Sequence, residues 1–457
     1  MSPALLSPEV HDRWPQRFAA WVGRWVPDAI TASVILTMLV ALIALASGNA
    51  VARVMEAYHQ GLWMLLPFTM QMTLIIILSS ALGATPFLRK VIGALARLPK
   101  TRNQVIALAF VSAGAASYLS WGLGYALLPI VAIYFSAEAE NRGIEVDFPF
   151  MFAVTYAAQA LWQYGLSSSA PLLIAGQGHF LQNVIGVVPL STTIWSPAAL
   201  MHEGLYAACA IGAACVLMPK HFRPISHFPD SLALTKPNTP APIRNGEKLS
   251  FAERLEQGRL VNFVVCGMMA CWLIDHFFLK RLGFELNVLT SGLLFLTFLL
   301  YGSIRLFARA VERSAASSWA VIVLYHLYAG VAGLIQFTSV GERMAKAFAY
   351  ISTPSTFPFI TAVAGSVFAC FIPSSGGQWT IQGYVTVKTA MAVGVSVQRG
   401  VLSLGVGDHV GNFLTPFWYA VVAGIGKVDF RVFFGYGVIF ALIWFLVGIT
   451  VFTFAPC

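Results

Sequence analysis

The chain has 457 residues, of which 58% are hydrophobic and only 10% are charged, and its net charge is +9. An ordinary soluble domain contains about 25% charged residues, so this composition excludes a soluble globular protein and predicts an all-α polytopic membrane protein. Nucleic-acid binding is not expected, because no basic stretch alternates with stacking aromatic residues. With a cytoplasmic N-terminus, most of the 28 Lys and Arg residues instead fall on predicted cytoplasmic segments, as the positive-inside rule requires.

A first set of apolar windows follows a cytoplasmic N-terminal segment at residues 1–24. Windows of about 20 residues cross the hydrocarbon, and residues 25–219 contain, in order, helices at 25–46 and 61–82, a hairpin at about 103–137, an interrupted helix at about 148–175 and a helix at 197–219. The uncharged stretch 103–137 is too long for one crossing and too short for two crossings with a turn. It therefore predicts a re-entrant hairpin.

The middle of the chain separates two halves. Residues 220–259 carry several prolines and mixed charges, which predicts a cytoplasmic linker with a short amphipathic helix near 251–257. A connecting transmembrane helix is expected at 260–279. The six cysteines show no metal-ligand spacing, so we expect small apolar packing residues and no metal site or bound cofactor.

The second half, residues 286–454, repeats the order of the first. It predicts helices at 286–304 and 317–337, a hairpin at about 357–392, an interrupted helix at about 400–426 and a helix at 432–454. An odd number of crossings separates equivalent points, so the second half is expected to be inverted, with about nine full spans, two hairpins and a periplasmic C-terminus. Inverted repeats with broken helices are typical of secondary transporters. Two ordinary helical bundles with glycine-rich turns are the alternative.

Four helix-breaking segments, at 120–124, at 165–171, at the heptad 373–379 and at 407–412 leading to Thr415-Pro416, are the candidate binding region. Unwound chain at membrane depth persists only where protein or a water-filled cavity covers it, and the positive end of a half-helix can hold an anion through free N–H groups. We expect the two hairpin tips and the two broken helices to meet there. The candidate substrate-binding residues are Ser120, Trp121, Gly122, Ser167, Ser168, Ser169, Ser374, Ser375, Gly376, Gly377, Gln378, Trp379, His409 and Asn412.

Asp408 is the candidate coupling residue, since it is the one acidic residue that the sequence places well inside a hydrophobic window. An intramembrane carboxylate is costly and by default functional. It would carry a proton or bind sodium, or else anchor the broken helix by a hydrogen bond. His409 would bind the substrate carboxylate or act as a hydrogen-bonding partner.

The residue content also narrows the function. No deeply placed arginine is found, which favours a small monocarboxylate over a dicarboxylate. The chain has no His-Glu-x-x-His pair and no nucleophile placed beside a base, so an intramembrane enzyme is a remote alternative.

Several motifs occur in an order that resembles one known family. The most specific is the run Pro-Ser-x-Gly-Gly-x-Trp-x-Ile-Gln-Gly at 373–383, and weaker motifs are Trp-Val-Pro-Asp at 25–28, Met-Gln-Met at 70–72, Ser-Trp-Gly at 120–122 and Pro-Phe-Trp at 416–418. Over nearly its whole length the chain resembles the short-chain fatty acid transporters, bacterial permeases associated with acetoacetate and butyrate uptake.

This resemblance implies a proton-coupled symporter of monocarboxylates that works by elevator-type alternating access, as a homodimer in the lipid bilayer of the bacterial inner membrane. A sodium-coupled carrier, or a carrier of dicarboxylates or other organic anions, is the alternative. Two positions depart from the family pattern, because Gln378 stands where the family has histidine and His409 where it has glutamine. If both faced one cavity, the exchange would leave the donor set intact.

Overall fold

The computed structural model describes residues 29–235, 250–315 and 318–455, and in these ranges it contains helices and no β-strand. Five of the described helices are long and apolar enough to cross a membrane, or six if one pair bent by 75° counts as a single span. The prediction of an all-α polytopic protein is confirmed in this form. The expected total of nine spans and two hairpins stays a prediction.

The first half begins with two helix pairs and continues into the first hairpin and the first broken helix. Its helices are α2 (Ala29–Ala46), α3 (Val51–Trp63), α4 (Leu66–Gly83), α5 (Pro86–Ala96), α6 (Arg102–Leu119), α7 (Trp121–Asn141), α8 (Phe148–Gln159), α9 (Ser169–Ala175), α10 (Gln182–Ile185) and α11 (Pro197–Leu217). Helices α6 and α7 pack against each other and are broken only at Ser120. Helices α8 and α9 are separated by a 3-10 turn and a loop.

Short elements and a connecting helix lead to the second half. They are α12 (Pro229–Leu232), α13 (Phe251–Gln257) and α14 (Arg259–Ile274), which continues as a π-helical turn over Asp275–Leu279. The short helix expected at 251–257 is therefore present. The second half contains α15 (Leu286–Tyr301), α16 (Ile304–Ala315), α17 (Trp319–Gln336), α18 (Val340–Ile351), α19 (Phe357–Ala369), α20 (Ser375–Ala392), α21 (Val397–Leu414), α22 (Pro416–Gly426), α23 (Arg431–Phe434) and α24 (Gly437–Phe454).

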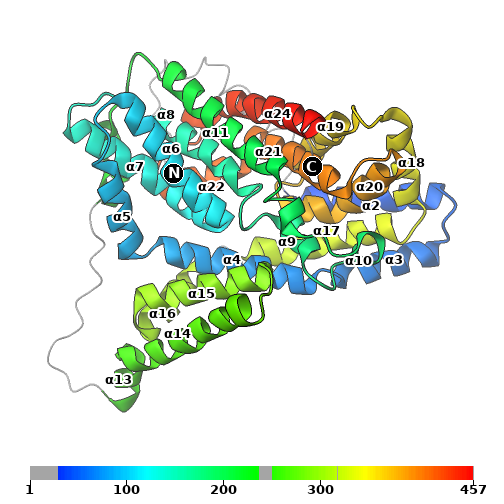
Figure 1. The fold of residues 1–457 in the computed structure, drawn as a ribbon, viewed down its shortest axis with the longest axis horizontal. Coiled ribbons are helices and arrows are strands. Elements are labelled where there is room, and N and C mark those ends of the chain that lie inside the picture. Colours follow the sequence, from blue (N-terminus) through cyan, green and yellow to red (C-terminus); the bar gives the residue numbers. More distant parts are fainter. Residues whose placement is uncertain (1–28, 236–249, 316–317, 456–457) are drawn as a thin grey trace.

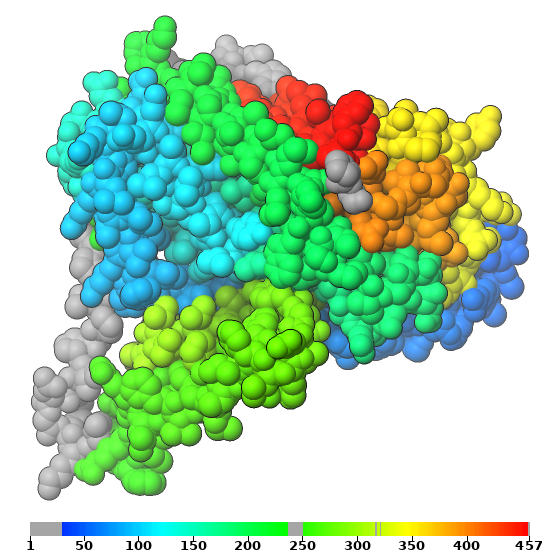
Figure 2. Space-filling view, viewed as in Figure 1, coloured from blue at the N-terminus to red at the C-terminus, as the bar shows by residue number. Residues whose placement is uncertain are grey.

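The helices form two groups (Figure 1). In the first, α17 packs on α2 and α3, and α4 packs on α15 and α16. In the second, α6, α7 and α8 pack together, α19 packs on α21, and α24 packs on α11 and α21. Helices α13–α16 project from the lower left of the molecule (Figure 2), and α14 exposes a surface of large apolar residues, including Leu260, Met268 and Phe278, as a helix facing lipid does.

Two helices were not predicted, and one expected helix is divided. Helices α16 and α18 contain charged residues such as Arg305, Arg309 and Lys346, so neither appears as an uncharged window, although each has one apolar side. The helix expected at 61–82 is interrupted at Met64 and Leu65, and its N-terminal part reaches back to Val51 as α3.

The segment Gly407–Asn412 was expected to be unwound, and this prediction is wrong. Helix α21 continues through Asp408 to Leu414, and the break falls at Thr415, directly before Pro416. The glycines serve close helix packing, because a Cβ atom on Gly407 would collide with the backbone of Ala362 in α19, and one on Gly411 would collide with Ala369. Small residues spaced in this way let membrane helices approach closely without unwinding.

The heptad Pro373–Trp379 was likewise expected to be non-helical, but only its first two residues are. Helix α20 begins at Ser375, and Ser374 is its N-cap, whose Oγ accepts from the N–H of Gly377 at 3.3 Å. Proline lacks an N–H and prevents α19 from continuing into α20, while a serine N-cap starts a new helix at once.

Candidate functional site

A small, partly open cavity, with a volume of only about 10 Å³, lies where the second hairpin, α21 and the first broken helix meet. Helix α20 contributes Ser375, Gln378 and Trp379, and α21 contributes Asp408. The remaining lining residues are Gln163, Tyr164, Ala170 and Pro171 from the break between α8 and α9, and Val401, Leu404 and Gly405 from α21. The second hairpin and both interrupted helices therefore share one cavity.

Asp408 is the charged group of this cavity. Its side chain is only 2% exposed, and neither carboxylate oxygen has a hydrogen-bond partner of normal geometry among the described residues. Ser375 and Gln163 are the polar side chains that interact with it. A buried carboxylate without a paired charge is strongly unfavourable in its ionised form, so this position favours a carboxyl that holds a proton or a bound ion.

The N-terminus of α20 also faces the cavity, at Ser375. In the described ranges no acceptor is found for the N–H groups of Ser375 and Gly376, whereas the N–H of Gly377 is capped by Ser374. Free amides at the positive end of an 18-residue helix attract an anion. An acid and an anion-binding helix end thus lie in the same cavity.

Two glutamines connect the cavity wall. Gln163 donates from Nε2 to the Ser375 hydroxyl at 3.4 Å, and Gln378 donates from Nε2 to the Gly365 carbonyl at 2.8 Å and to Gln382 Oε1 at 2.7 Å. The Oε1 atoms of Gln163 and Gln378 are buried without a partner in the described part of the chain. Both glutamines therefore keep an acceptor for a bound donor.

Gly376 and Gly377 have a packing role. A Cβ atom on Gly376 would lie 2.8 Å from the Tyr325 hydroxyl, and one on Gly377 would collide with the Tyr328 ring. Neither separation is long enough for a real contact, so both positions require glycine for the approach of α20 to α17. The sequence predicted these two residues as substrate contacts, and the structure places them against aromatic rings on that side of α20.

The first hairpin tip lies outside this cavity. The hydroxyls of Ser120 and Ser79 are hydrogen-bonded at 2.8 Å, and the Ser167 hydroxyl accepts from the Trp121 N–H at 2.7 Å. Gly122 packs on Ser79, and Ser168 donates to the Gln163 carbonyl at 2.5 Å. Ser169 is buried at the start of α9. These predicted site residues contact mainly one another and do not line the Asp408 cavity.

The two hairpin tips are nevertheless linked through Trp418 of α22. Its ring lies 6.1 Å from that of Trp121, measured between centroids, and its indole N–H donates to the Pro373 carbonyl at 2.9 Å. Trp121 also contacts Trp162 and Tyr125. Of the two tryptophans among the predicted substrate-binding residues, Trp379 lines the cavity and Trp121 belongs to this aromatic cluster.

His409 faces a different environment from its neighbour Asp408. Its ring packs against Trp444 and Phe413, each at a centroid distance of 4.9 Å, and neither ring nitrogen has a partner among the described residues. Asn412 is buried one turn further along α21, and its carbonyl accepts from the Tyr156 hydroxyl. Gln378 lines the cavity and His409 does not, so the exchanged pair does not share one donor set.

Sequence reasoning missed three buried polar residues. Gln163 lines the cavity. Gln159 lies four residues earlier, and two polar residues at this spacing indicate one polar helix face, which is the sequence signal for Gln163. Glu203 and His202 lie two turns into α11, both buried and without hydrogen-bond partners in the described ranges. Asp408 is therefore not the only buried carboxyl among the described residues, since Glu203 is only 8% exposed.

Comparison with known proteins assigns the chain to a family. A family model described as "Short chain fatty acid transporter" matches residues 11–455. Relatives from Escherichia coli (strain K12) and Haemophilus influenzae (strain ATCC 51907 / DSM 11121 / KW20 / Rd), each named "Putative short-chain fatty acid transporter", are both 26% identical and cover 94% of this chain and 98% and 97% of their own lengths.

Two solved structures share the fold at low sequence identity. The Alcanivorax borkumensis YdaH transporter, described as having an unusual topology, superposes with a TM-score of 0.59 at 14% identity, and Neisseria gonorrhoeae MtrF, placed in a class of antimetabolite efflux pumps, with 0.58 at 15%. Each covers 96% of this chain and 97% of its own. Together with the match over nearly the whole length, these findings show that the chain belongs to the short-chain fatty acid transporter family.

Proposed function

We propose that this protein is a secondary active transporter that carries a short-chain monocarboxylate together with a proton. The observation that carries the proposal is the unpaired Asp408 carboxyl beside the Ser375 hydroxyl and the N-terminus of α20. Family membership supports transport of short-chain fatty acids, and the cavity supports the coupling.

The substrate carboxylate would bind at the start of α20. The free amides of Ser375 and Gly376, with the Ser375 hydroxyl, supply donors for it, and the helix dipole favours its negative charge. No lysine or arginine is among the described residues that line the cavity. One negative charge can be balanced by a helix end and a neutral acid, whereas a dicarboxylate would leave its second charge unpaired.

Asp408 would couple this binding to protons. Two carboxylates in one low-dielectric cavity cannot both be ionised without a large cost, so the anion binds when Asp408 carries a proton. The protonated carboxyl then donates a hydrogen bond to the substrate. On the other side of the membrane the substrate and the proton of Asp408 are both released, so that one proton is transported with each anion.

Alternating access would arise from movement of the second helix group against the first. The second group contains the first hairpin and both broken helices, and the two groups meet where α20 of the second hairpin packs on α17 as well as on α21 and where α4 packs on α7 (Figure 1). The inverted relation of the two halves, an elevator-type movement, a homodimer and the bacterial inner membrane complete the proposal and rest on the family resemblance.

Uptake of labelled butyrate or acetoacetate into proteoliposomes tests this function. We expect accumulation that follows an imposed proton gradient. Dependence on a sodium gradient alone would assign the sodium-coupled alternative, and uptake that dicarboxylates block better than monocarboxylates would overturn the substrate class.

The variant Asp408→Asn tests the coupling residue. We expect it to abolish gradient-driven accumulation while exchange of labelled for unlabelled butyrate continues, because asparagine still donates a hydrogen bond but cannot release a proton. Glu203→Gln is the matched control for a buried carboxyl outside the cavity and should still accumulate substrate. Proton-driven accumulation by Asp408→Asn would remove Asp408 from the coupling step.

A further inference from the structure

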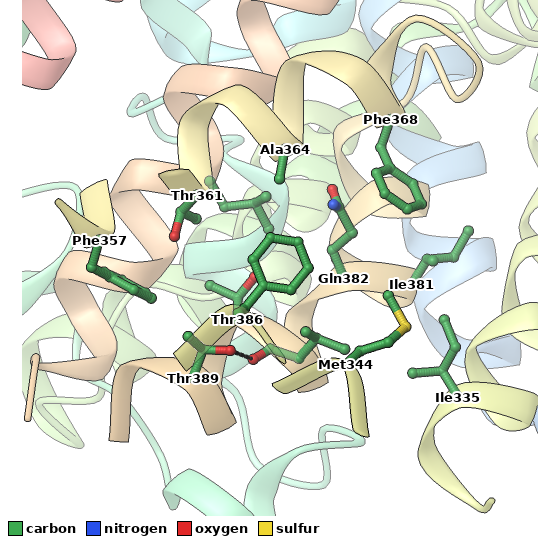
Figure 3. A pocket seen from close by; sticks show the side chains of 13 residues that line it. Ile335, Met344, Phe357, Thr361, Ala364, Phe368, Ile381, Gln382, Thr386 and Thr389 are labelled. Carbon is green, nitrogen blue, oxygen red and sulfur yellow. Dashed lines mark hydrogen bonds between the residues drawn. The ribbon is translucent and has the colours of Figure 1, made fainter. Parts of the chain in front are cut away.

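A second cavity, also partly open and with a volume of about 30 Å³, lies beside the Asp408 cavity and is mainly apolar. Figure 3 shows its lining from α17 to α20, with Phe357, Phe368, Ile335, Ile381 and Met344 around the space. The other lining residues are Phe348, Thr361, Ala364, Gln382, Val385, Thr386, Thr389 and Leu404. The hydroxyl of Thr389 donates to the Val385 carbonyl at 2.8 Å, so it is not available to a ligand.

The two cavities share a wall. Leu404 lines both of them. Gln378 lines the Asp408 cavity, Gln382 one turn later lines the apolar cavity, and the Gln378 amide donates to Gln382 Oε1 at 2.7 Å. The polar cavity and the apolar cavity are thus neighbours that share Leu404 and are connected by one hydrogen-bonded glutamine pair.

The chemistry of the two cavities matches the two ends of a fatty acid. The Asp408 cavity supplies a carboxyl, a hydroxyl and helix amides for a carboxylate, while the apolar cavity supplies phenylalanine rings and aliphatic side chains for a hydrocarbon chain. Burial of apolar surface is the favourable term for such a chain and is worth about fourfold in affinity per methylene. A polar cavity alone would not distinguish longer acids from acetate in this way.

We propose that the apolar cavity is the acyl-chain compartment of the substrate site, and that its size sets the longest acid that the protein carries. This inference rests on the proposed function, since it places the chain of the same monocarboxylate whose carboxylate binds beside Asp408. The chain passes the Gln378–Gln382 pair, which separates to admit it. Acetate needs only the first cavity, and longer acids need both.

A cavity-filling variant tests this compartment. Ala364 lines the cavity and is only partly buried, and Figure 3 shows its side chain beside the space near Gln382. In Ala364→Leu we expect the KM for hexanoate uptake to rise by about tenfold or more, given the fourfold worth of each methylene, while the KM for acetate stays unchanged. Ala364→Ser, which adds little volume, is the matched control and should leave both values as in the wild type.

A cavity-enlarging variant gives the opposite change and does not depend on the filled variant folding. Val385→Ala removes two methyl groups from the lining. Octanoate should therefore inhibit butyrate uptake by this variant more strongly than it inhibits butyrate uptake by the wild type. Equal changes for acetate and hexanoate in Ala364→Leu, or unchanged chain-length preference in both variants, would overturn the compartment. Failure of the wild type to take up any of these acids would instead overturn the proposed function itself.

Discussion

The tips of the two hairpins differ in how their polar groups are bonded. At the first tip, Ser120 bonds to Ser79 of α4, and the Trp121 N–H is taken by Ser167 from the broken helix. At the second tip, Ser374 caps its own helix and donates to the Tyr325 hydroxyl at 3.0 Å, while Ser375 accepts from Gln163 at 3.4 Å and lines a cavity with Asp408. Both tips are thus bonded to neighbouring helices, but only the second one also lines a cavity that contains a carboxyl group.

This difference teaches that similar local sequence need not give equivalent sites. Both tips contain serine, glycine and tryptophan, although in a different order, yet only the second tip contributes residues to the Asp408 cavity. The substrate site is therefore expected on one tip, with the other acting as support.

The largest difference is expected between Ser375→Ala and Ser167→Ala. A hydrogen bond to a charged group is worth about 1.5–3 kcal/mol, so Ser375→Ala should raise the KM for butyrate by about tenfold or more without changing thermal stability. Ser167→Ala should lower the unfolding temperature, because it leaves the buried Trp121 N–H without an acceptor. It should leave the KM for butyrate unchanged. Uptake kinetics and thermal unfolding in detergent measure both, and a KM increase in Ser167→Ala alone would reverse the assignment of the tips.

The next effect concerns the glycines of the second tip. Gly377→Ala would press a methyl group against the Tyr328 ring, and overpacking of this kind costs about 1–3 kcal/mol of stability. Gly424→Ala on α22, where nothing lies within 4 Å of an added Cβ, is the matched control and should not destabilise the protein. If Gly377→Ala kept its unfolding temperature but lost butyrate affinity, Gly377 would belong to the binding surface after all.

A smaller effect is expected from Trp418→Phe. The change removes the hydrogen bond to the Pro373 carbonyl, which is worth about 1 kcal/mol, while keeping an aromatic ring near Trp121. The unfolding temperature should fall slightly, and the susceptibility of residues 370–374 to proteolysis should rise. Unchanged proteolysis would show that the second tip holds its position without the link to the first.

The smallest effect is expected from His409→Gln, which restores the residue that the family resemblance gives for this position. Because His409 packs against Trp444 and Phe413 outside the cavity, the KM for butyrate should not change. Gln378→His, which alters the cavity wall itself, should change it. An equal change of KM in both variants would place His409 at the substrate.

Much of the helical framework could be predicted from hydropathy and turn residues. The stretches 103–137 and 357–392 stood out because they are nearly uncharged and have a serine- or proline-rich centre, and the helix pairs α6/α7 and α19/α20 lie there. That these pairs are re-entrant stays a prediction. Helices α16 and α18 were missed because their charged sides interrupt the apolar windows. The windows could not reveal that Gly407 and Gly411 serve packing against α19, since the glycine spacing fits both a break and a close helix contact.

The site was only partly predictable for a related reason. Asp408 stood out because ionisable residues are rare at membrane depth, and Ser375 and Gln378 followed from the heptad. Gln163 was missed because it lies two residues before Gly165, where the predicted break of the first interrupted helix begins. The bonding of Ser120 and Ser167 depends on which helices pack beside them, and that information is not local to the sequence.

The close packing of Gly407 and Gly411 on α19 bears on the proton transfer that we propose for Asp408. Helix α21 stays helical past Asp408 and packs closely on α19. The Asp408 carboxyl is therefore held on a rigid helix and has little freedom to move toward either side of the membrane. Its exposure to water must then change through motion of its surroundings, chiefly the first turn of α20 about the short link at 370–374. Water entry at that turn, followed by hydrogen exchange of the Ser375 and Gly376 amides, would mark the moment at which the transporter loads or unloads.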